Sequence, residues 1–86
     1  MRRDPEFFGD TELTLLYMAR RLPDALRLEK LLDANGVEYL IETGTYTGGL
    51  LMRRELTGAF FYVNADSLQG ARELLVANAY KPYDGR

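Results

Sequence analysis

The residues best suited to chemistry lie in a glycine-rich stretch, residues 44–58, between two strand-like segments. Arg53 and Arg54 carry guanidinium groups, which bind phosphate or carboxylate through paired N–H donors. Gly48 and Gly49 leave the backbone free to turn its N–H groups toward an anion. These residue types predict contact with an anionic ligand or a partner protein. The spacing matches neither common phosphate-loop motif, so no particular nucleotide is indicated.

The same stretch is long for a connection, because hairpin loops usually need only about two to five residues. Three interpretations stay open: a mobile loop that contacts a partner or an anion, a simple insertion or a loop that holds a β-bulge with extended strands, and a lid over a small-molecule site. Its apolar centre, Leu50, Leu51 and Met52, suits extended strands or a contact surface. We therefore expect function here first.

Catalytic and metal chemistry have little support from the residue types. The chain has no cysteine and no histidine, which excludes thiol nucleophiles and removes the commonest neutral-pH base. The candidate acids are Glu38, Glu42, Glu55 and Asp66. Glu38 and Glu42, four residues apart on one strand, would be separated by about 13 Å, which exceeds the separation in glycosidase carboxylate pairs. We therefore expect a protein that is not an enzyme and binds no cofactor or metal.

Other charged and aromatic residues give weaker signals. Arg20 and Arg21 precede a predicted helix, whose N-terminus favours an anion; they either join the later arginines in a basic patch or stay solvated. Residues 57–64 match the aromatic RNA-recognition strand only in part, and the net charge is −2, so we expect no nucleic-acid partner. No apolar run approaches about 18 residues, so we expect no membrane partner.

The length of 86 residues predicts one domain, and the hydrophobic fraction of 47% predicts that it folds. We expect a loosely ordered segment at 1–11, a folded domain at 12–80 and a tail at 81–86. Phe7 and Phe8 are expected either to cover an edge of the core or to help a contact with a partner. Because no cysteine is available for disulfides, the cytoplasm is the expected location.

Hydrophobic periodicity predicts three strands and two helices, each helix with a single apolar stripe. Gly36 is the expected left-handed cap of the first helix. Asp66 or Ser67 is expected to cap the second, with Asp66 and Gln69 in a capping box. The predicted elements are strand 13–19, helix 23–35, strand 37–43, strand 59–64 and a helix from 66 or 67 to about 78.

This β-α-β-β-α order predicts an α+β domain in which both helices cover one face of a small sheet. The crossover rule places the third strand beside the first or close to it. The expected fold is therefore a ferredoxin-like plait whose fourth strand is absent or very short, with residues 80–83 as a docked tail or edge strand. Such a sheet leaves an edge open, and an open edge invites pairing with a second copy.

The third strand carries adjacent aromatic residues on opposite faces. Phe60 and Tyr62 share one face, while Phe61 and Val63 share the other. One pair is expected to face the helices, and the other then needs cover. We therefore expect a homodimer, with Phe60 and Tyr62 as candidate interface residues alongside the apolar centre of residues 44–58.

Several core and cap positions also match a known pattern: Leu31, Leu32, Gly36 and Val37, then Val63, Asp66, Ala71, Leu74 and Leu75. Over roughly residues 13–78 the chain resembles short bacterial domains described as signal-transducing proteins. The resemblance implies a plait like that of the PII regulators and an activity that is not established, so it assigns no catalytic residue. We expect a non-enzymatic regulatory or protein-interaction module; the alternative is a domain that binds an anionic metabolite or nucleotide through residues 44–58.

Overall fold

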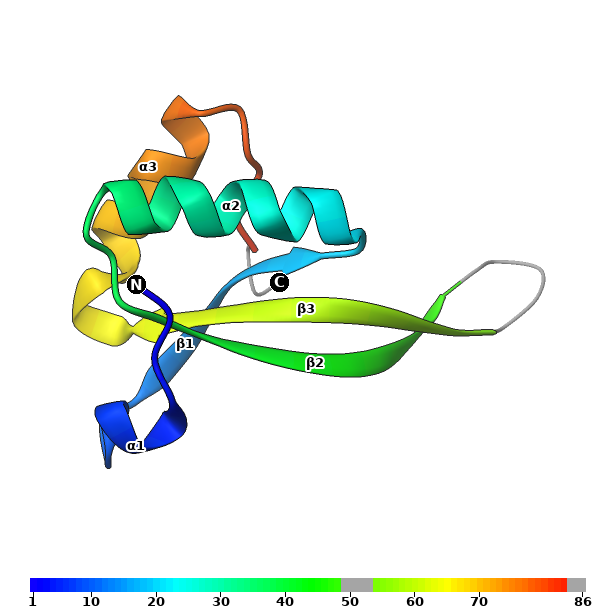
Figure 1. The fold of residues 1–86 in the computed structure, drawn as a ribbon, viewed down its shortest axis with the longest axis horizontal. Coiled ribbons are helices and arrows are strands. Elements are labelled where there is room, and N and C mark those ends of the chain that lie inside the picture. The colour runs from blue at the N-terminus through cyan, green and yellow to red at the C-terminus, as the bar shows by residue number, and fades with distance from the viewer. Residues whose placement is uncertain (49–53, 84–86) are drawn as a thin grey trace.

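The computed structural model describes residues 1–48 and 54–83, and of residues 45–48 and 54–57 it describes the backbone only. Two larger helices and three strands follow one another in the expected order, after a short N-terminal helix. The elements are α1 (Pro5–Phe8), β1 (Leu13–Ala19), α2 (Leu22–Ala34), β2 (Tyr39–Gly48), β3 (Arg54–Asn64), a 3-10 turn (Ala65–Ser67) and α3 (Leu68–Ala77). The antiparallel sheet has the strand order β1-β3-β2, and α2 and α3 lie on one face of it (Figure 1).

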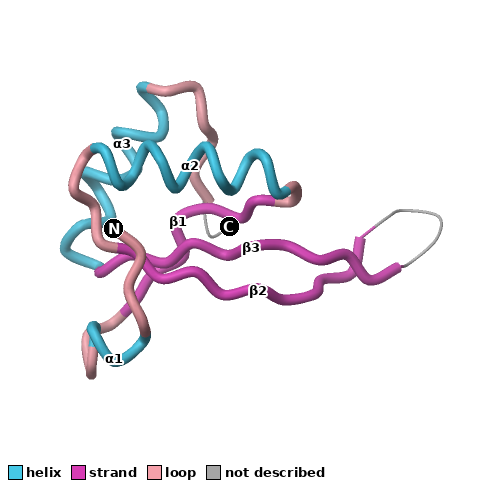
Figure 2. The backbone as a smooth tube through the Cα atoms, in the orientation of Figure 1, coloured by secondary structure: helices cyan, strands magenta, loops and turns pink. Residues whose placement is uncertain are grey.

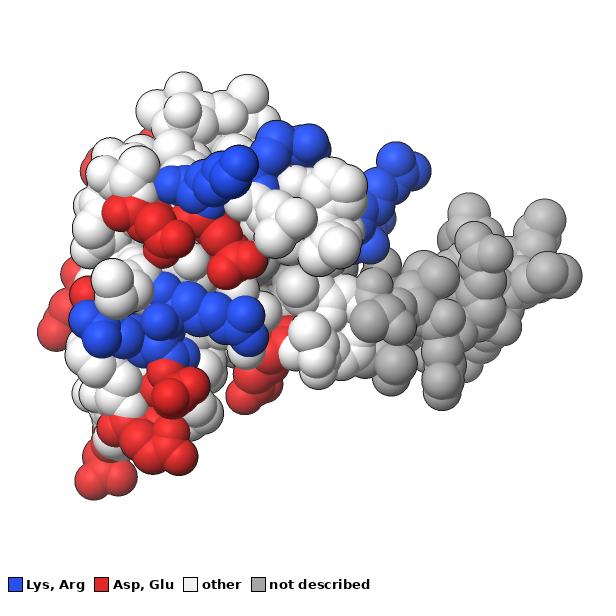
Figure 3. All heavy atoms as spheres, viewed as in Figure 1, with Lys and Arg blue, Asp and Glu red and all other residues white. Residues whose placement is uncertain are grey.

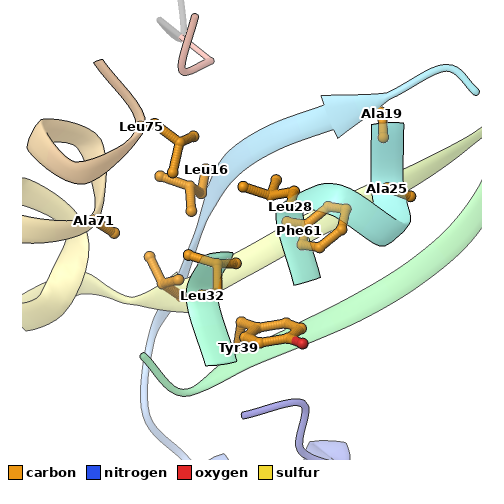
Figure 4. Close-up of a cluster of buried hydrophobic side chains, with 10 residues drawn as sticks. Leu16, Ala19, Ala25, Leu28, Leu32, Tyr39, Phe61, Ala71 and Leu75 are labelled. Atoms are coloured by element: carbon orange, nitrogen blue, oxygen red, sulfur yellow. The ribbon is translucent and has the colours of Figure 1, made fainter. Parts of the chain in front are cut away.

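The core lies between that face and the two helices, and the predicted apolar stripes build it (Figure 4). Leu28 and Leu32 of α2 and Leu75 of α3 are fully buried there, against Phe61 of β3. Val63 is also fully buried, so the face formed by Phe61 and Val63 is the one that the helices cover. Phe60 and Tyr62 therefore face away from the helices.

Strand β1 contributes two consecutive residues to this core because its pairing with β3 is irregular. Leu15 is opposite Tyr62 and Tyr17 is opposite Phe61, so Leu16 is an extra residue in β1. A bulge of this kind lets neighbouring residues face the same side of a strand. Leu16 is fully buried in the core and Tyr17 packs partly against it.

The turn before α3 is capped differently from the prediction. The Asn64 side chain accepts a hydrogen bond from the backbone N–H of Asp66 at 2.8 Å, at the start of the 3-10 turn. Ser67 precedes α3 but makes no capping hydrogen bond with its side chain. The predicted capping box of Asp66 and Gln69 is therefore wrong, because the 3-10 turn moves the cap to Asn64.

Both large helices end in the same left-handed turn. In α2 the turn residue is Gly36, with φ of 69°, and Val37 N–H bonds the Leu32 carbonyl at 3.0 Å. In α3 the turn residue is Ala79, with φ of 66°, and Tyr80 N–H bonds the Leu75 carbonyl at 2.9 Å. Glycine adopts this conformation without the steric penalty that a Cβ atom brings.

We therefore expect Ala79→Gly to raise the free energy of unfolding by about 1 kcal/mol and the melting temperature by about 4 °C. Thermal and urea unfolding followed by circular dichroism measure both. Gly36→Ala is the matched control, since a Cβ there meets nothing within 4 Å and only backbone strain changes. That control should lose a similar amount, and an Ala79→Gly variant less stable than the parent would contradict the explanation.

The β2–β3 hairpin is longer than predicted, and the expected strand ends at Thr43 and Ala59 are wrong. Pairing continues without a register shift from Tyr39–Val63 to Gly48–Arg54. A glycine weakens a strand, but a Cβ built on Gly44 would lie 3.4 Å from Cε2 of Phe60, so this ring covers the glycine. Within residues 44–58, the described parts 44–48 and 54–58 are therefore extended strands.

Candidate functional site: the open edge of strand β2

The two outer strands of the sheet are β1 and β2, and each is covered by a chain end over a short length (Figure 2). On the β1 side, Tyr83 N–H bonds the Leu16 carbonyl at 2.8 Å, so the tail docks there without forming a strand. On the β2 side, Arg2 forms a parallel bridge with Tyr39. Most of the outer edge of β2 lies beyond this bridge.

The backbone hydrogen bonds of Tyr39 show which groups of β2 point outward. Its N–H bonds the Met1 carbonyl at 3.1 Å, and its carbonyl accepts from Arg3 N–H at 2.8 Å. Since backbone groups alternate between the two sides of a strand and the β2–β3 register is regular, every second residue after Tyr39 also points outward. These outward residues are Ile41, Thr43, Thr45 and Thr47.

No described residue hydrogen-bonds the outward backbone groups of these four residues. We call the outer side of β2 from Ile41 to Thr47 the free edge. Natural proteins usually protect such an edge with proline, lysine, a bulge or a short strand. Strand β2 runs from Tyr39 to Gly48 with no proline, no lysine and no bulge. Glu42 is the only charged residue within it. The free edge thus remains competent to pair with another strand.

The second half of the free edge lies on a two-stranded extension of the sheet, residues 44–48 and 54–58, which we call the arm. Strand β1 pairs with β3 only as far as Ala19–Ala59, so the arm extends past β1 and past the helical layer (Figure 1). A ribbon of two strands has marginal stability in water, and a third strand or other cover stabilises it. The arm is therefore the part of the sheet that gains most from an added strand.

A shallow apolar hollow of about 160 Å³ lies where the arm meets α2. Its wall includes Ala25 and Ala59, and Leu22 beside it is 69% exposed. Arg20 and Arg21 line it as well. The basic patch expected from these arginines and the later pair is not established, because Arg53 lies outside the described residues and only the backbone of Arg54 is described.

The structure places only part of the site predicted from the sequence. Gly48 ends β2 and pairs with Arg54, the first residue of β3. Phe60 and Tyr62 lie half-buried on the sheet face away from α2 and α3, so their predicted contact with a partner stays a prediction. The other predicted contact residues, Gly49, Leu50, Leu51, Met52 and Arg53, lie outside the described residues.

The face that carries Phe60 and Tyr62 has some cover from the N-terminal segment, since α1 lies on that side of the sheet (Figure 1). Phe8 of α1 is 6% exposed and Leu40 of β2 is 7% exposed, and neither belongs to the main core. Phe7 is 53% exposed, so of the two phenylalanines only Phe8 is buried.

The N-terminal segment is held at the start of β2 by Arg3. Its Nε donates to Glu38 Oε2 at 2.6 Å and its Nη2 to Oε1 at 3.3 Å, while its guanidinium lies 4.5 Å from the centre of the Phe7 ring. The hydrogen bond from Arg3 lowers the pKa of Glu38 below its ordinary value. Glu38, a candidate acid in the sequence, thus serves to anchor this segment.

Two tyrosines connect the sheet to α2 through carboxylates. The Tyr39 hydroxyl donates to Asp33 Oδ1 at 3.0 Å, with Glu29 Oε1 at 3.5 Å, and burial followed by this hydrogen bond raises its pKa well above the ordinary value. The Tyr17 hydroxyl donates to Asp24 Oδ2 at 2.7 Å. Burial and then that bond raise the pKa of Tyr17 to about 12. Both phenols are therefore structural hydrogen-bond donors at neutral pH.

Charge does not single out another site. Acidic and basic side chains alternate over the face around α2 and the N-terminal segment instead of forming one basic surface (Figure 3). Among the described side chains, those of residues 1–44 and 58–83, no group of three or more acidic side chains is placed to hold a metal ion. In the same ranges no helix is long and apolar enough to cross a membrane.

Sequence reasoning expected an open sheet edge but ended the second strand at Thr43, so it missed the part of the free edge at Thr45 and Thr47. The signal that was available is the composition of residues 45–47, Thr-Tyr-Thr, since β-branched and aromatic residues favour strands.

Comparison with known proteins found no match to a protein-family description, a curated protein or a solved structure.

Proposed function

We propose that this chain is a non-enzymatic regulatory or protein-interaction module that works as a homodimer in the cytoplasm and pairs through the free edge of β2. The single observation that carries the proposal is the regular, unprotected outer edge of β2 between Tyr39 and Gly48. Strand addition to such an edge is a common way for a domain to bind a polypeptide, because backbone hydrogen bonds supply the affinity.

The proposal includes the ferredoxin-like plait and the resemblance to bacterial signal-transducing domains. In its support, the strand order is β1-β3-β2, and Tyr83 docks on the outer edge of β1, where the fourth strand of a plait would lie. A regulatory module of this kind needs no catalytic group, because it acts by whether its interface is paired or free. The Arg3–Glu38 pair and the hydrogen bonds of Tyr17 and Tyr39 to α2 have structural explanations in keeping with such a role.

Thr43→Pro tests the proposal, because the Thr43 N–H points outward from β2. Proline lacks this N–H, but the hydrogen bonds between β2 and β3 do not use it, so the fold should survive. We expect the wild-type chain to dimerise in sedimentation equilibrium and Thr43→Pro to dimerise at least about tenfold more weakly. Circular dichroism checks that the variant is folded.

Thr43→Val is the matched control, since valine keeps the N–H and the branched shape of threonine. It should dimerise like the wild-type chain. A wild-type chain that stays strictly monomeric at millimolar concentration would overturn the homodimer. A folded Thr43→Pro variant that dimerises as tightly as the wild type would show that the dimer, if present, uses another surface.

A further inference from the structure

We propose that the strand added to β2 is β2 of a second copy, paired antiparallel with it about a twofold axis that passes through Gly44. This inference rests on the proposed function and specifies its geometry. The free edge has a definite beginning and end. At one end, the outward groups of Tyr39 are already bonded to Met1 and Arg3. At the other end, β2 stops at Gly48.

The middle of the free edge, which runs from Ile41 to Thr47, is Gly44. An antiparallel pairing centred on Gly44 places Ile41 opposite Thr47 of the second copy, and Thr43 opposite its Thr45. Residues with outward groups thus meet each other, as hydrogen-bonded pairs require. Every residue of the free edge is paired in both copies, and no pair within β2 uses the outward groups of Tyr39, which bond Met1 and Arg3.

Other registers use the edge less well. A pairing centred on Thr43 places Thr47 opposite Tyr39, whose outward groups are occupied. A pairing centred on Thr45 leaves Ile41 without a partner in β2 of the second copy. A pairing centred on Glu42 places this carboxylate directly opposite Glu42 of the second copy, and like charges in that position are destabilising. Backbone complementarity and charge therefore favour the same centre, Gly44.

The geometry also explains why the arm exists. Residues 45–47 of one copy lie against residues 41–43 of the other, and the latter belong to the full three-stranded sheet. Each arm thereby gains the body of the second copy as additional strands, which relieves the marginal stability of a two-stranded ribbon. The twofold axis is perpendicular to the sheet, so one continuous six-stranded sheet forms with all four large helices on the same face.

Disulfide trapping tests this register. The chain has no cysteine, so a single introduced cysteine reacts only with its mate in another copy. Gly44 has no positive φ, and its Cβ would meet Phe60 at 3.4 Å, an ordinary contact, so Gly44→Cys should fold. In the proposed dimer the Cα atoms of position 44 in the two copies are about 4.5 Å apart, as in a non-hydrogen-bonded pair. This separation allows a disulfide.

Glu42→Cys is the matched control, because Glu42 is on the same strand and the same face as Gly44 and is exposed. In the proposed register the Cα atoms of position 42 in the two copies are offset by about 13 Å along the strand, which is too far for a disulfide. Under mild oxidation we expect most of Gly44→Cys to run as a covalent dimer on a non-reducing gel, forming at least about tenfold faster than with Glu42→Cys. Adding Thr43→Pro to Gly44→Cys should remove this difference.

The outcomes separate the inference from the proposed function. If the chain dimerises, Thr43→Pro weakens the dimer, and Glu42→Cys crosslinks as fast as Gly44→Cys, the register is wrong while the function of the β2 edge stands. If the chain dimerises but neither introduced cysteine crosslinks, the second copy binds elsewhere and the inference fails. Efficient crosslinking of Gly44→Cys that Thr43→Pro does not reduce would indicate random collision and would also overturn it.

Discussion

Replacing Phe61 by alanine is expected to lower the free energy of unfolding by about 3–5 kcal/mol, a large share of the stability of a domain this small. The Phe61 side chain is fully buried, and its ring centre lies 5.8 Å from that of Tyr39. Phe61 is also the residue opposite the bulge in β1, and it belongs to one buried cluster with residues of both outer strands and of α2 and α3. Alanine would leave a cavity that these elements cannot fill together.

Urea unfolding measures this loss, and Phe60→Ala provides the matched control. Phe60 is the neighbouring residue of the same type, but it is half-buried and faces away from α2 and α3. Under conditions where the chain is monomeric, Phe60→Ala should lose less than half as much free energy of unfolding. Equal losses in the monomer would contradict the assignment of the core to the Phe61 face.

Alkaline pH is expected to destabilise the fold strongly, because Tyr17 and Tyr39 must stay protonated in it. Unfolded tyrosine has a pKa of about 10. The folded chain raises the pKa of Tyr17 to about 12 and that of Tyr39 also well above the ordinary value. The stability from each phenol is fully present below about pH 10 and is lost as the pH rises toward the folded pKa. The expected slope is at most about 1.4 kcal/mol per pH unit for each tyrosine.

Urea unfolding at a series of pH values from about 8 to about 12 would show this decline, with a smaller contribution from Tyr17, whose exposed part is screened by solvent. Tyr39→Phe should flatten the decline and lower the free energy of unfolding at neutral pH, since the bond to Asp33 is lost. Tyr62→Phe is the control, because the Tyr62 hydroxyl bonds no described residue, so its loss should leave the free energy of unfolding at neutral pH unchanged. A profile that stays flat over the whole series in the wild-type chain would contradict the assigned role of both phenols.

The helices were predictable because their signals are local. The stripe of Ala25, Leu28 and Leu32 repeats at the helical period, and Gly36 marks the end of α2 through its left-handed conformation. Strand β1 was also predicted with its observed bounds, Leu13–Ala19. In these segments, neighbours along the chain are sufficient to decide the backbone conformation.

The cap of α3 and the bulge in β1 were not predictable in this way. Asp66 fits a local capping pattern, yet the capping hydrogen bond is made by Asn64, because a 3-10 turn, Ala65–Ser67, lies between β3 and α3. Leu16 and Tyr17 both reach the core only because β1 slips by one residue against β3. The bulge depends on the pairing of β1 with β3, and the cap depends on the 3-10 turn that joins β3 to α3. The pattern within one segment contains neither piece of information.

The candidate site also depends partly on local sequence signals and partly on the assembled sheet. By itself the sequence determined that residues 44–58 contain the unusual part of the chain, that Phe60 and Phe61 face opposite ways, and that cysteine and histidine chemistry are absent. Only the tertiary structure decided that residues 44–48 and 54–58 continue two strands and that Arg2 and Arg3 stop short of Ile41, so that the outer edge of β2 is free of described partners. The physical reason is that a strand conformation at Gly44 is stabilised by its partner Gly58 and by the ring of Phe60, contacts that form only once the sheet has assembled.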